Sequence, residues 1–347
     1  MHTSALPTRD PEAAERFNQG RERFRRYLGG GGDDDDLWQA EKSFAAAEQN
    51  DPGFRLASFF QAVTLNELRD SDRAIEKLRS LTSEGLDFLP EVYVQLAYAH
   101  TKRYEGEDYR RAEEALDHAA QAAAAAKRED LRPLIDSYRA FLYAVIGGRG
   151  EKEKRDSYLN QAIELGEALL RGRQSAGSFE FSDLETEVHN SLGIAYMRKG
   201  ERAEPDSELQ RQWWARAQAE YEAGLRRGWA TARLLQNYGT LLRLQGDQEW
   251  WLGRLDRARG YYRKAIELYV RCREINPWDG FSDYRLAELH AKQGDWKAAR
   301  EYERTGRGKM SSVKESGWGR VAAAVTAEDV AALYEPLNRE RAQPASQ

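Results

Sequence analysis

The chain has 347 residues, of which 41% are hydrophobic and 32% charged, and it contains one cysteine. A formal net charge of -5 argues against a general binder of polyanions such as nucleic acid, and one cysteine excludes an internal disulfide or a site with several cysteine ligands. No run approaches the roughly 18 apolar residues of a membrane span, and the N-terminus lacks a signal-peptide core. We therefore expect a cytoplasmic protein with no membrane partner.

The first half of the chain predicts a tail at residues 1–10 and about four helix pairs in residues 11–170. The helices of the first pair begin near Pro11 and Leu37, and GGGGDDDD at residues 29–36 lies between them. Four glycines carry a high entropic cost in a helix and four aspartates repel one another, so we expect a solvated loop. The run lacks the alternating ligands and closing glutamate of a calcium loop.

The second half begins with RGRQSAGSFEFSD at residues 171–183, which interrupts the helical period and predicts a hinge between two subarrays. About three further helix pairs are expected in residues 184–305. In the middle pair the first helix should end at Gly246, and the second should run from about Gln248 to Asn276. Residues 306–347 are expected to form a loop, a capping helix that starts at Thr326, and a tail.

The segment from Tyr261 to Ala299 reads YYRKAIELYVRCREINPWDGFSDYRLAELHAKQGDWKAA. It resembles the second helix of one tetratricopeptide repeat followed by the first helix of the next, a unit of about 34 residues with small residues where its helices touch. Similar motifs recur in residues 11–305, among them LGIAY at residues 192–196. The resemblance implies an all-α fold, a right-handed solenoid of helical hairpins with a C-terminal capping helix, and a function in binding.

In that family the first helices line the concave groove, and bound peptides lie there. Carried onto residues 187–290, the resemblance gives these partner-binding candidates: Asn190, Ile194, Met197, Arg233, Gln236, Asn237, Thr240, Arg243, Phe281, Tyr284 and Arg285. Asn237 and Arg285 match two places of the family's clamp for a C-terminal carboxylate, whereas Asn190, Ile194 and Phe281 depart from it. The arginines still fit an acidic peptide through bidentate pairs.

Two tryptophan pairs, Trp213–Trp214 and Trp250–Trp251, each precede or begin an expected second helix. Adjacent helical residues point about 100° apart, so at most one member of each pair can lie comfortably in the core. Either the pairs pack between helices, or they form an exposed aromatic anchor for a partner. Alternating aromatic and arginine residues after Trp250 could also stack nucleobases, although the acidic net charge argues against nucleic acid.

Catalytic chemistry has no motif in this sequence. HExxH, CxxC, P-loop and GxSxG patterns are absent, and His100, His189 and His290 fall at packing positions of the repeat. We expect no catalytic residue, no metal and no cofactor.

The favoured function is an adaptor or scaffold that binds a protein or peptide segment, with an acidic segment as one option. The alternatives are a ligand-responsive sensor that bends at residues 171–183, and an enzyme or nucleic-acid binder of unrecognised type. The sequence does not indicate the oligomeric state.

Overall fold

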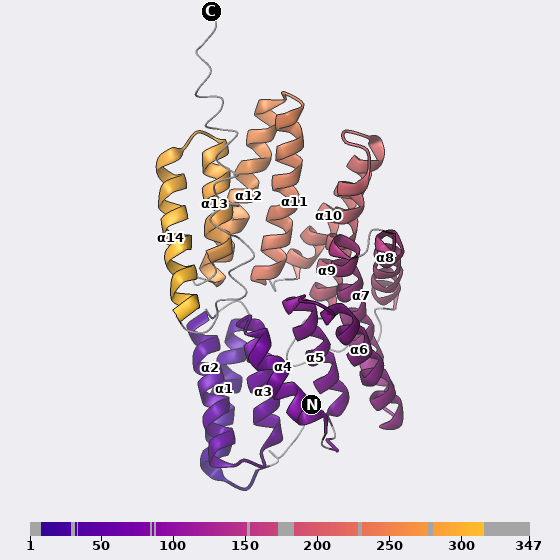
Figure 1. The fold of residues 1–347 in the computed structure, drawn as a ribbon, viewed down its shortest axis with the longest axis vertical. Helices are drawn as coiled ribbons and strands as arrows, with labels where there is room; N and C mark the ends of the chain where they lie inside the picture. The colour runs from indigo at the N-terminus through magenta and orange to yellow at the C-terminus, as the bar shows by residue number, and fades with distance from the viewer. Residues whose placement is uncertain are drawn as a thin grey trace, which may run out of the picture. The chain divides into compact units, whose positions relative to one another are not determined.

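The computed structural model describes residues 8–28, 32, 34–83, 85–86, 88–150, 153–172, 184–227, 231–276 and 280–315. Every regular element in these ranges is helical, which confirms the predicted all-α class (Figure 1). The predicted capping helix from Thr326 lies outside the described residues, as do residues 173–183 of the predicted hinge. No described helix combines the length and apolar character needed to cross a bilayer.

The described helices follow one another as seven pairs. They are α1 (Pro11–Leu28) with α2 (Asp34–Asn50), α3 (Arg55–Glu67) with α4 (Ser71–Thr82), α5 (Leu89–Arg103) with α6 (Asp108–Ala125), α7 (Arg132–Arg149) with α8 (Arg155–Arg171), α9 (Leu184–Arg202) with α10 (Glu208–Arg226), α11 (Ala232–Trp251) with α12 (Leu255–Ile275), and α13 (Gly280–Lys292) with α14 (Trp296–Glu315). A short 3₁₀ turn, η1 (Glu129–Leu131), precedes α7. The number of pairs agrees with the sequence analysis.

The chain divides into two compact units, Met1–Leu241 and Leu242–Gln347. The boundary falls inside α11, so the first part of this helix belongs to unit 1 and its last part to unit 2. The sequence analysis placed a division at residues 171–183 instead. In unit 1, small and aromatic side chains fill the spaces between helices: the Phe17 ring lies 5.5 Å from Phe44, 4.9 Å from Phe54 and 5.4 Å from Phe60.

The Gly/Asp run is shorter as a loop than the sequence analysis predicted. Helix α2 begins at Asp34, so three of the four aspartates belong to its first turn. The positive end of the helix dipole stabilises carboxylates there. Asp36 also forms ion pairs with Arg26 at 3.1 Å and Arg23 at 3.5 Å, so α1 neutralises part of the charge whose repulsion predicted a loop.

The ends of α11 and α14 were also predicted wrongly. Helix α11 continues through Gly246 to Trp251, because a Cβ atom at position 246 would lie 2.5 Å from Tyr262 and the glycine lets that ring pack closely. The turn comes at Gly253, whose φ of 72° suits glycine, so Trp250 and Trp251 end α11 rather than begin α12. Helix α14 extends to Glu315, so residues 306–315 are helical rather than a loop.

Candidate functional site

Two basic side chains of unit 1, Lys102 of α5 and Arg233 of α11, lie over aromatic rings, and the charge of Arg69, which follows α3, acts on both. We call Arg69, Lys102 and Arg233 the cation cluster. The Lys102 Nζ lies 4.9 Å from the ring centroid of Tyr98, and the Arg233 Cζ lies 5.1 Å from the same centroid. The Arg233 guanidinium also lies 5.5 Å from the Phe141 ring. Two positive charges therefore share one tyrosine and stand at most about 10 Å apart, which is comparable to the Debye length of about 8 Å at physiological salt.

Lys102 carries the clearest electrostatic signature in this cluster. Its Nζ donates a hydrogen bond to the backbone oxygen of Asn66 at 2.5 Å. Burial lowers the pKa of Lys102 to about 8; Glu67 opposes this effect, and Arg69 adds to it. The lowered pKa means that the surroundings supply less negative charge than a protonated lysine needs.

Arg233 is held in place by stacking and by one carboxylate. Its Nη2 donates to Glu187 at 2.5 Å, whereas its Nε and Nη1 atoms are buried with no hydrogen-bond partner among the described residues. Burial lowers the pKa of this guanidinium too, against the opposing charge of Glu67. Arg233 is half-buried, and its two buried nitrogen atoms without a partner cost stability unless something compensates them.

Arg69 has a backbone conformation that arginine seldom adopts. It follows the C-terminal end of α3 with a φ of 65°, in the left-handed region where glycine is the usual residue. Its Nη2 donates to the Gln236 side chain at 2.9 Å and thereby joins α3 to α11 within unit 1. The same left-handed conformation recurs at Tyr104, Lys127 and Asp206, so at Arg69 it serves to end the helix.

The predicted groove residues of α9 do not present an open surface. Asn190, Ile194 and Met197 have exposed fractions of 1%, 7% and 2%, because α9 packs against α7, α8 and α10. Asn190 accepts a hydrogen bond from Asn237 at 2.9 Å. The prediction that these three α9 side chains face a groove is therefore wrong in this structure.

The predicted groove residues on the unit 1 part of α11 are more exposed than those of α9: Arg233, Asn237 and Thr240 are half-buried, and Gln236 is buried. Arg233 belongs to the cation cluster, and Gln236 accepts the hydrogen bond from Arg69. Asn237 and Thr240 are half-buried, and the Thr240 hydroxyl donates to the Gln236 backbone oxygen at 2.8 Å. Of the predicted set, the structure therefore brings Arg233 and Gln236 into the cluster.

The remaining predicted groove residues, Arg243, Phe281, Tyr284 and Arg285, lie in unit 2. Two of them are neutralised by Glu288, which is 3% exposed: Arg285 lies 2.7 Å and Arg243 3.5 Å from its carboxylate. Burial raises the pKa of Glu288, but Lys292, Arg243 and Arg285 outweigh it and lower the pKa to about 2. Arg285 also stacks over Phe281 at 4.9 Å. This internal network leaves these arginines less suited to an external acidic ligand than the sequence analysis expected.

The two tryptophan pairs differ in exposure, and each places at most one member in the core. Trp214 is 6% exposed, and its indole donates to the Met197 backbone oxygen at 3.3 Å. Trp213 stacks on Tyr196 with ring centroids 5.8 Å apart, and Arg216 lies over it at 5.2 Å. Trp250 is half-buried, whereas Trp251 is 85% exposed. Trp251 is therefore the accessible member of the predicted aromatic anchor.

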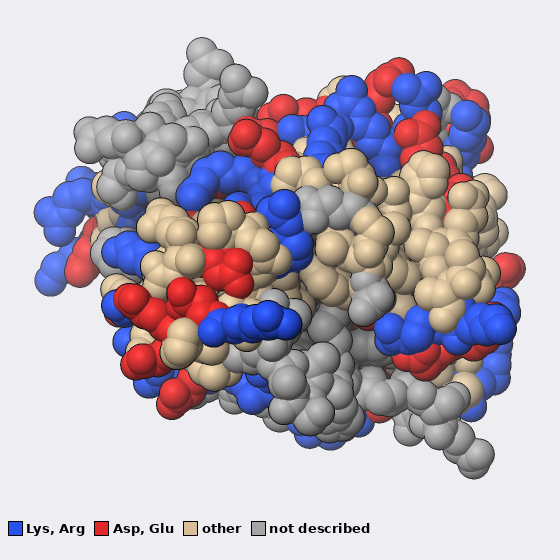
Figure 2. All heavy atoms as spheres, turned by 90° about the horizontal axis from the view of Figure 1, so that it is seen from below, with Lys and Arg blue, Asp and Glu red and all other residues tan. Residues whose placement is uncertain are grey.

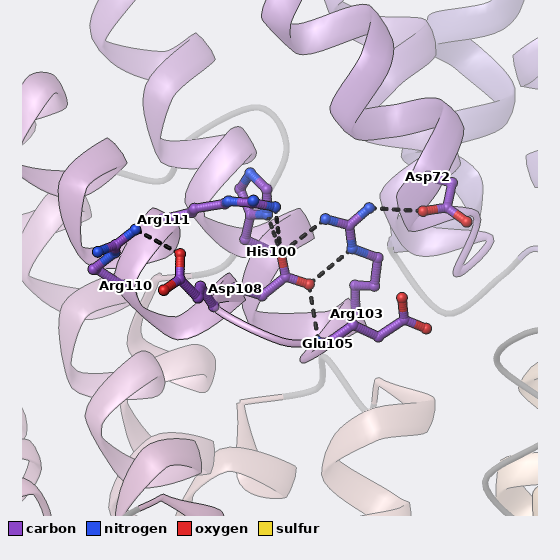
Figure 3. A network of polar contacts seen from close by, with 8 residues as sticks. Asp72, His100, Arg103, Glu105, Asp108, Arg110 and Arg111 are labelled. Carbon is purple, nitrogen blue, oxygen red and sulfur yellow. Dashed lines mark hydrogen bonds and ion pairs between the residues drawn. The ribbon is translucent and has the colours of Figure 1, made fainter.

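The most extensive histidine contact in unit 1 is a polar network at the turn between α5 and α6 (Figure 3). Asp108, which is fully buried, accepts hydrogen bonds from Arg103 at 2.8 Å and from the Glu105 amide at 3.0 Å, and it contacts the His100 Nδ1 at 2.7 Å. Burial raises the pKa of Asp108, but these partners outweigh it and lower the pKa to about 2. His100 is 2% exposed, so the network holds the turn together rather than presenting a reactive group.

Outside the cation cluster, positive and negative side chains lie next to one another on the surface. Figure 2 shows basic and acidic side chains interspersed on the face seen from below. The part of the chain that the structure describes has no group of three or more His, Cys, Asp and Glu side chains placed to hold a metal ion. The cation cluster, with its unsatisfied donors and its aromatic support, is therefore the candidate site.

No protein-family model and no curated protein sequence match this chain. Among solved structures, BtubC (BKLC) from P. vanneervenii is similar with a TM-score of 0.38 and 20% identity, over 72% of this chain and 91% of that one. A human IFIT1 dimer with PPP-AAAA gives 0.36 and 15%, over 93% and 81%. A monomeric IFIT1 mutant with m7Gppp-AAAA gives 0.36 and 13%, over 95% and 83%. Likenesses this weak carry no argument about function.

Two members of the cation cluster were missed by the sequence analysis, although part of the signal was available. Tyr98 follows Ala97 in the third helix pair as Ile194 follows Gly193 in the fifth. Applying the groove positions to that earlier pair would have identified Tyr98 but not Lys102, because the place of Met197 falls on Thr101. The approach of Arg233 to both of them has no such signal, because helical spacing says nothing of contacts between distant pairs.

Proposed function

We propose that this chain is a non-catalytic binding protein that holds an acidic segment of a partner protein at the cation cluster of unit 1. The observation that carries the proposal is the convergence of Lys102 and Arg233 on one tyrosine ring. Their charges are only partly balanced by Glu67 and Glu187. Carboxylates of a partner would supply the missing negative charge and hydrogen-bond acceptors, and the fixed aromatic rings would reduce the ordering cost on the protein side.

The test is fluorescence anisotropy of a labelled oligoglutamate peptide with the intact chain. The double variant Lys102→Met/Arg233→Met keeps apolar packing against Tyr98 but removes both charges, and we expect it to weaken binding by about tenfold or more. Arg216→Met is the matched control, since Arg216 also lies over aromatic rings, 5.2 Å from Trp213 and 5.8 Å from Tyr196. Equal binding by the double variant and the intact chain would move the site elsewhere.

Two further ligands separate this function from the alternatives. Oligolysine should not bind at the cation cluster, because like charges repel. Oligolysine binding that the double variant abolished would contradict selection for negative charge at this site. An oligoribonucleotide of matched charge tests the expectation that nucleic acid is not a partner. If it bound more tightly than oligoglutamate and lost affinity in the same double variant, the protein-segment proposal would be replaced by nucleic-acid binding.

A further inference from the structure

Three exposed apolar side chains lie together where α11 turns into α12, and we call Trp251, Leu252 and Leu255 the apolar tip. They are 85%, 41% and 42% exposed. The turn lies at one end of the helix pair (Figure 1), and Gly253 with its positive φ closes it. The other large apolar side chain in the described ranges with comparable exposure is Leu209, at 53%, which stands apart in unit 1. The tip therefore concentrates apolar surface that folding leaves in water.

Basic side chains follow the apolar tip along α12, and we call them its basic surround. The exposed cationic residues at the start of α12 and along its first three turns are Arg254, Arg257, Arg259, Arg263 and Lys264. The acidic residues in the same stretch are Glu249, which is 3.3 Å from Arg254 and 3.9 Å from Arg257, and Asp256, which is 3.6 Å from Arg259. From Glu249 to Lys264 five positive charges stand against two negative ones, a net charge of +3, although the whole chain is acidic.

The shape and chemistry of this end select one kind of partner. A tryptophan and two leucines that project from a turn need a surface that can admit them without a preformed pocket. The interfacial region of a bilayer does so, and tryptophan prefers that depth. Anionic headgroups attract nearby arginine and lysine side chains, each contributing to surface binding. An apolar insertion joined to a basic surround gives the two signals that reversible attachment needs.

We propose that the apolar tip and its basic surround dock this protein reversibly onto an anionic membrane surface. The contact is peripheral, so it needs no membrane-spanning helix. The sequence analysis expected no membrane partner because no apolar run could span a bilayer, and that observation does not concern a peripheral contact. It is independent of the cation cluster: Trp251, Leu252 and Leu255 lie in unit 2, whereas Lys102 and Arg233 lie in unit 1.

The experiment is co-sedimentation of the intact chain with phosphatidylserine/phosphatidylcholine vesicles, compared with phosphatidylcholine alone. We expect binding to the anionic vesicles that weakens as salt is raised. The variant Trp251→Ser/Leu252→Ser/Leu255→Ser should lower the partition coefficient by about tenfold or more. Leu209→Ser removes an equally exposed leucine outside the tip and should change nothing. Because the substituted side chains are exposed, circular dichroism should show unchanged helicity.

A second readout follows the tryptophan itself. The difference in emission between the intact chain and Trp251→Phe isolates this indole, and it should shift to shorter wavelength when anionic vesicles are added. The charge variant Arg257→Glu/Arg259→Glu should bind phosphatidylserine vesicles more weakly and with less dependence on salt.

Two results would overturn the docking proposal. One is failure of the intact chain to sediment with anionic vesicles. The other is a triple tip variant that still binds them as the intact chain does. If vesicles did not bind but the tip variant changed a dimer into a monomer in analytical ultracentrifugation, the tip would be a contact between copies instead. The Lys102→Met/Arg233→Met variant should keep full vesicle binding, so failure of one proposal leaves the other distinguishable.

Discussion

Lys102 holds a charge where little water reaches it, and this has a measurable consequence for stability. Its pKa is lowered by burial from the ordinary value of 10.5 to about 8, so the folded chain binds the proton less well than the unfolded chain. The cost is fully present below about pH 8 and disappears as the pH rises toward the unfolded value. Lys102→Met should therefore raise the free energy of unfolding by about 2 kcal/mol at pH 7, and by little above pH 10.

Denaturant unfolding followed by circular dichroism at both pH values measures this difference. The charged groups near Lys102 are Glu67, Arg69, Glu187 and Arg233, so the buffer series must stay in a range where all four keep their charge. A variant with the stability of the intact chain at pH 7 would mean that water or a counter-ion compensates Lys102. We therefore expect Lys102→Met to stabilise the folded chain and to weaken binding of the acidic peptide. Binding sites often lower the stability of the protein that carries them.

Close packing between helices explains why α11 continues through a glycine instead of ending there. Gly246 lies inside α11 with the Tyr262 ring against it, and an added Cβ would approach that ring to 2.5 Å. Gly246→Ala should lower the free energy of unfolding by about 1–3 kcal/mol, because overpacking outweighs the better helix propensity of alanine.

The matched control is Gly260→Ala in α12, where an added Cβ meets nothing within 4 Å. That substitution should raise stability by about 0.5–1 kcal/mol, since alanine loses less backbone entropy on folding. Denaturant midpoints of the two variants should thus move in opposite directions. A similar gain from both would show that Tyr262 can move aside at little cost.

The helices themselves were largely predictable, and their ends were not. Apolar residues at helical spacing with small residues at contacts, such as Ala112, Leu116 and Ala119 in α6, fixed which segments are helical and how they pair. Helix ends depend on contacts with other helices. Helix α2 begins before the predicted Leu37 because Asp36 forms ion pairs with arginines of α1, and α11 continues beyond the predicted Gly246 because Tyr262 packs on that glycine. Residue spacing contains neither fact.

For the molecule as a whole, two buried carboxylates anchor separate units. Asp108 in unit 1 and Glu288 in unit 2 both have pKa values lowered to about 2 by basic partners. Each therefore contributes stability that is present above the ordinary pKa near 4 and is lost as the pH falls toward 2. Asp108→Asn and Glu288→Gln should each lower stability by about 2–3 kcal/mol at pH 7.

Hydrogen exchange read by mass spectrometry locates these effects. Asp108→Asn should speed exchange in α5 and α6, and Glu288→Gln should speed it in α13 and the unit 2 part of α11, each within its own unit. The variants should also lose less stability than the intact chain between pH 5 and pH 3, because they lack the carboxyl group that takes up a proton on unfolding in this range. Uniformly faster exchange across both units in either variant would show that the division at α11 has no energetic meaning.

The candidate site could be predicted only in part, because it depends on contacts between helix pairs that are far apart in the sequence. The groove positions of α11 gave Arg233 and Gln236, but Gln236 meets Arg69 across 167 positions of sequence. Local periodicity identifies the face that a side chain occupies and not the distant helix pair that it reaches. Burial of Asn190, Ile194 and Met197 was missed because spacing within α9 does not show that α7, α8 and α10 all pack against it.

Because the first part of α11 completes the cation cluster, the order of synthesis matters for unit 1. Tyr98 and Lys102 leave the ribosome well before Arg233, roughly ten seconds earlier at common elongation rates. During that interval the α3–α7 helices are already long enough to pair, while the aromatic rings that Arg233 later covers remain accessible. A nascent chain arrested before residue 231 should therefore be recognised by cellular folding factors as unfinished, even though most of its helices have formed.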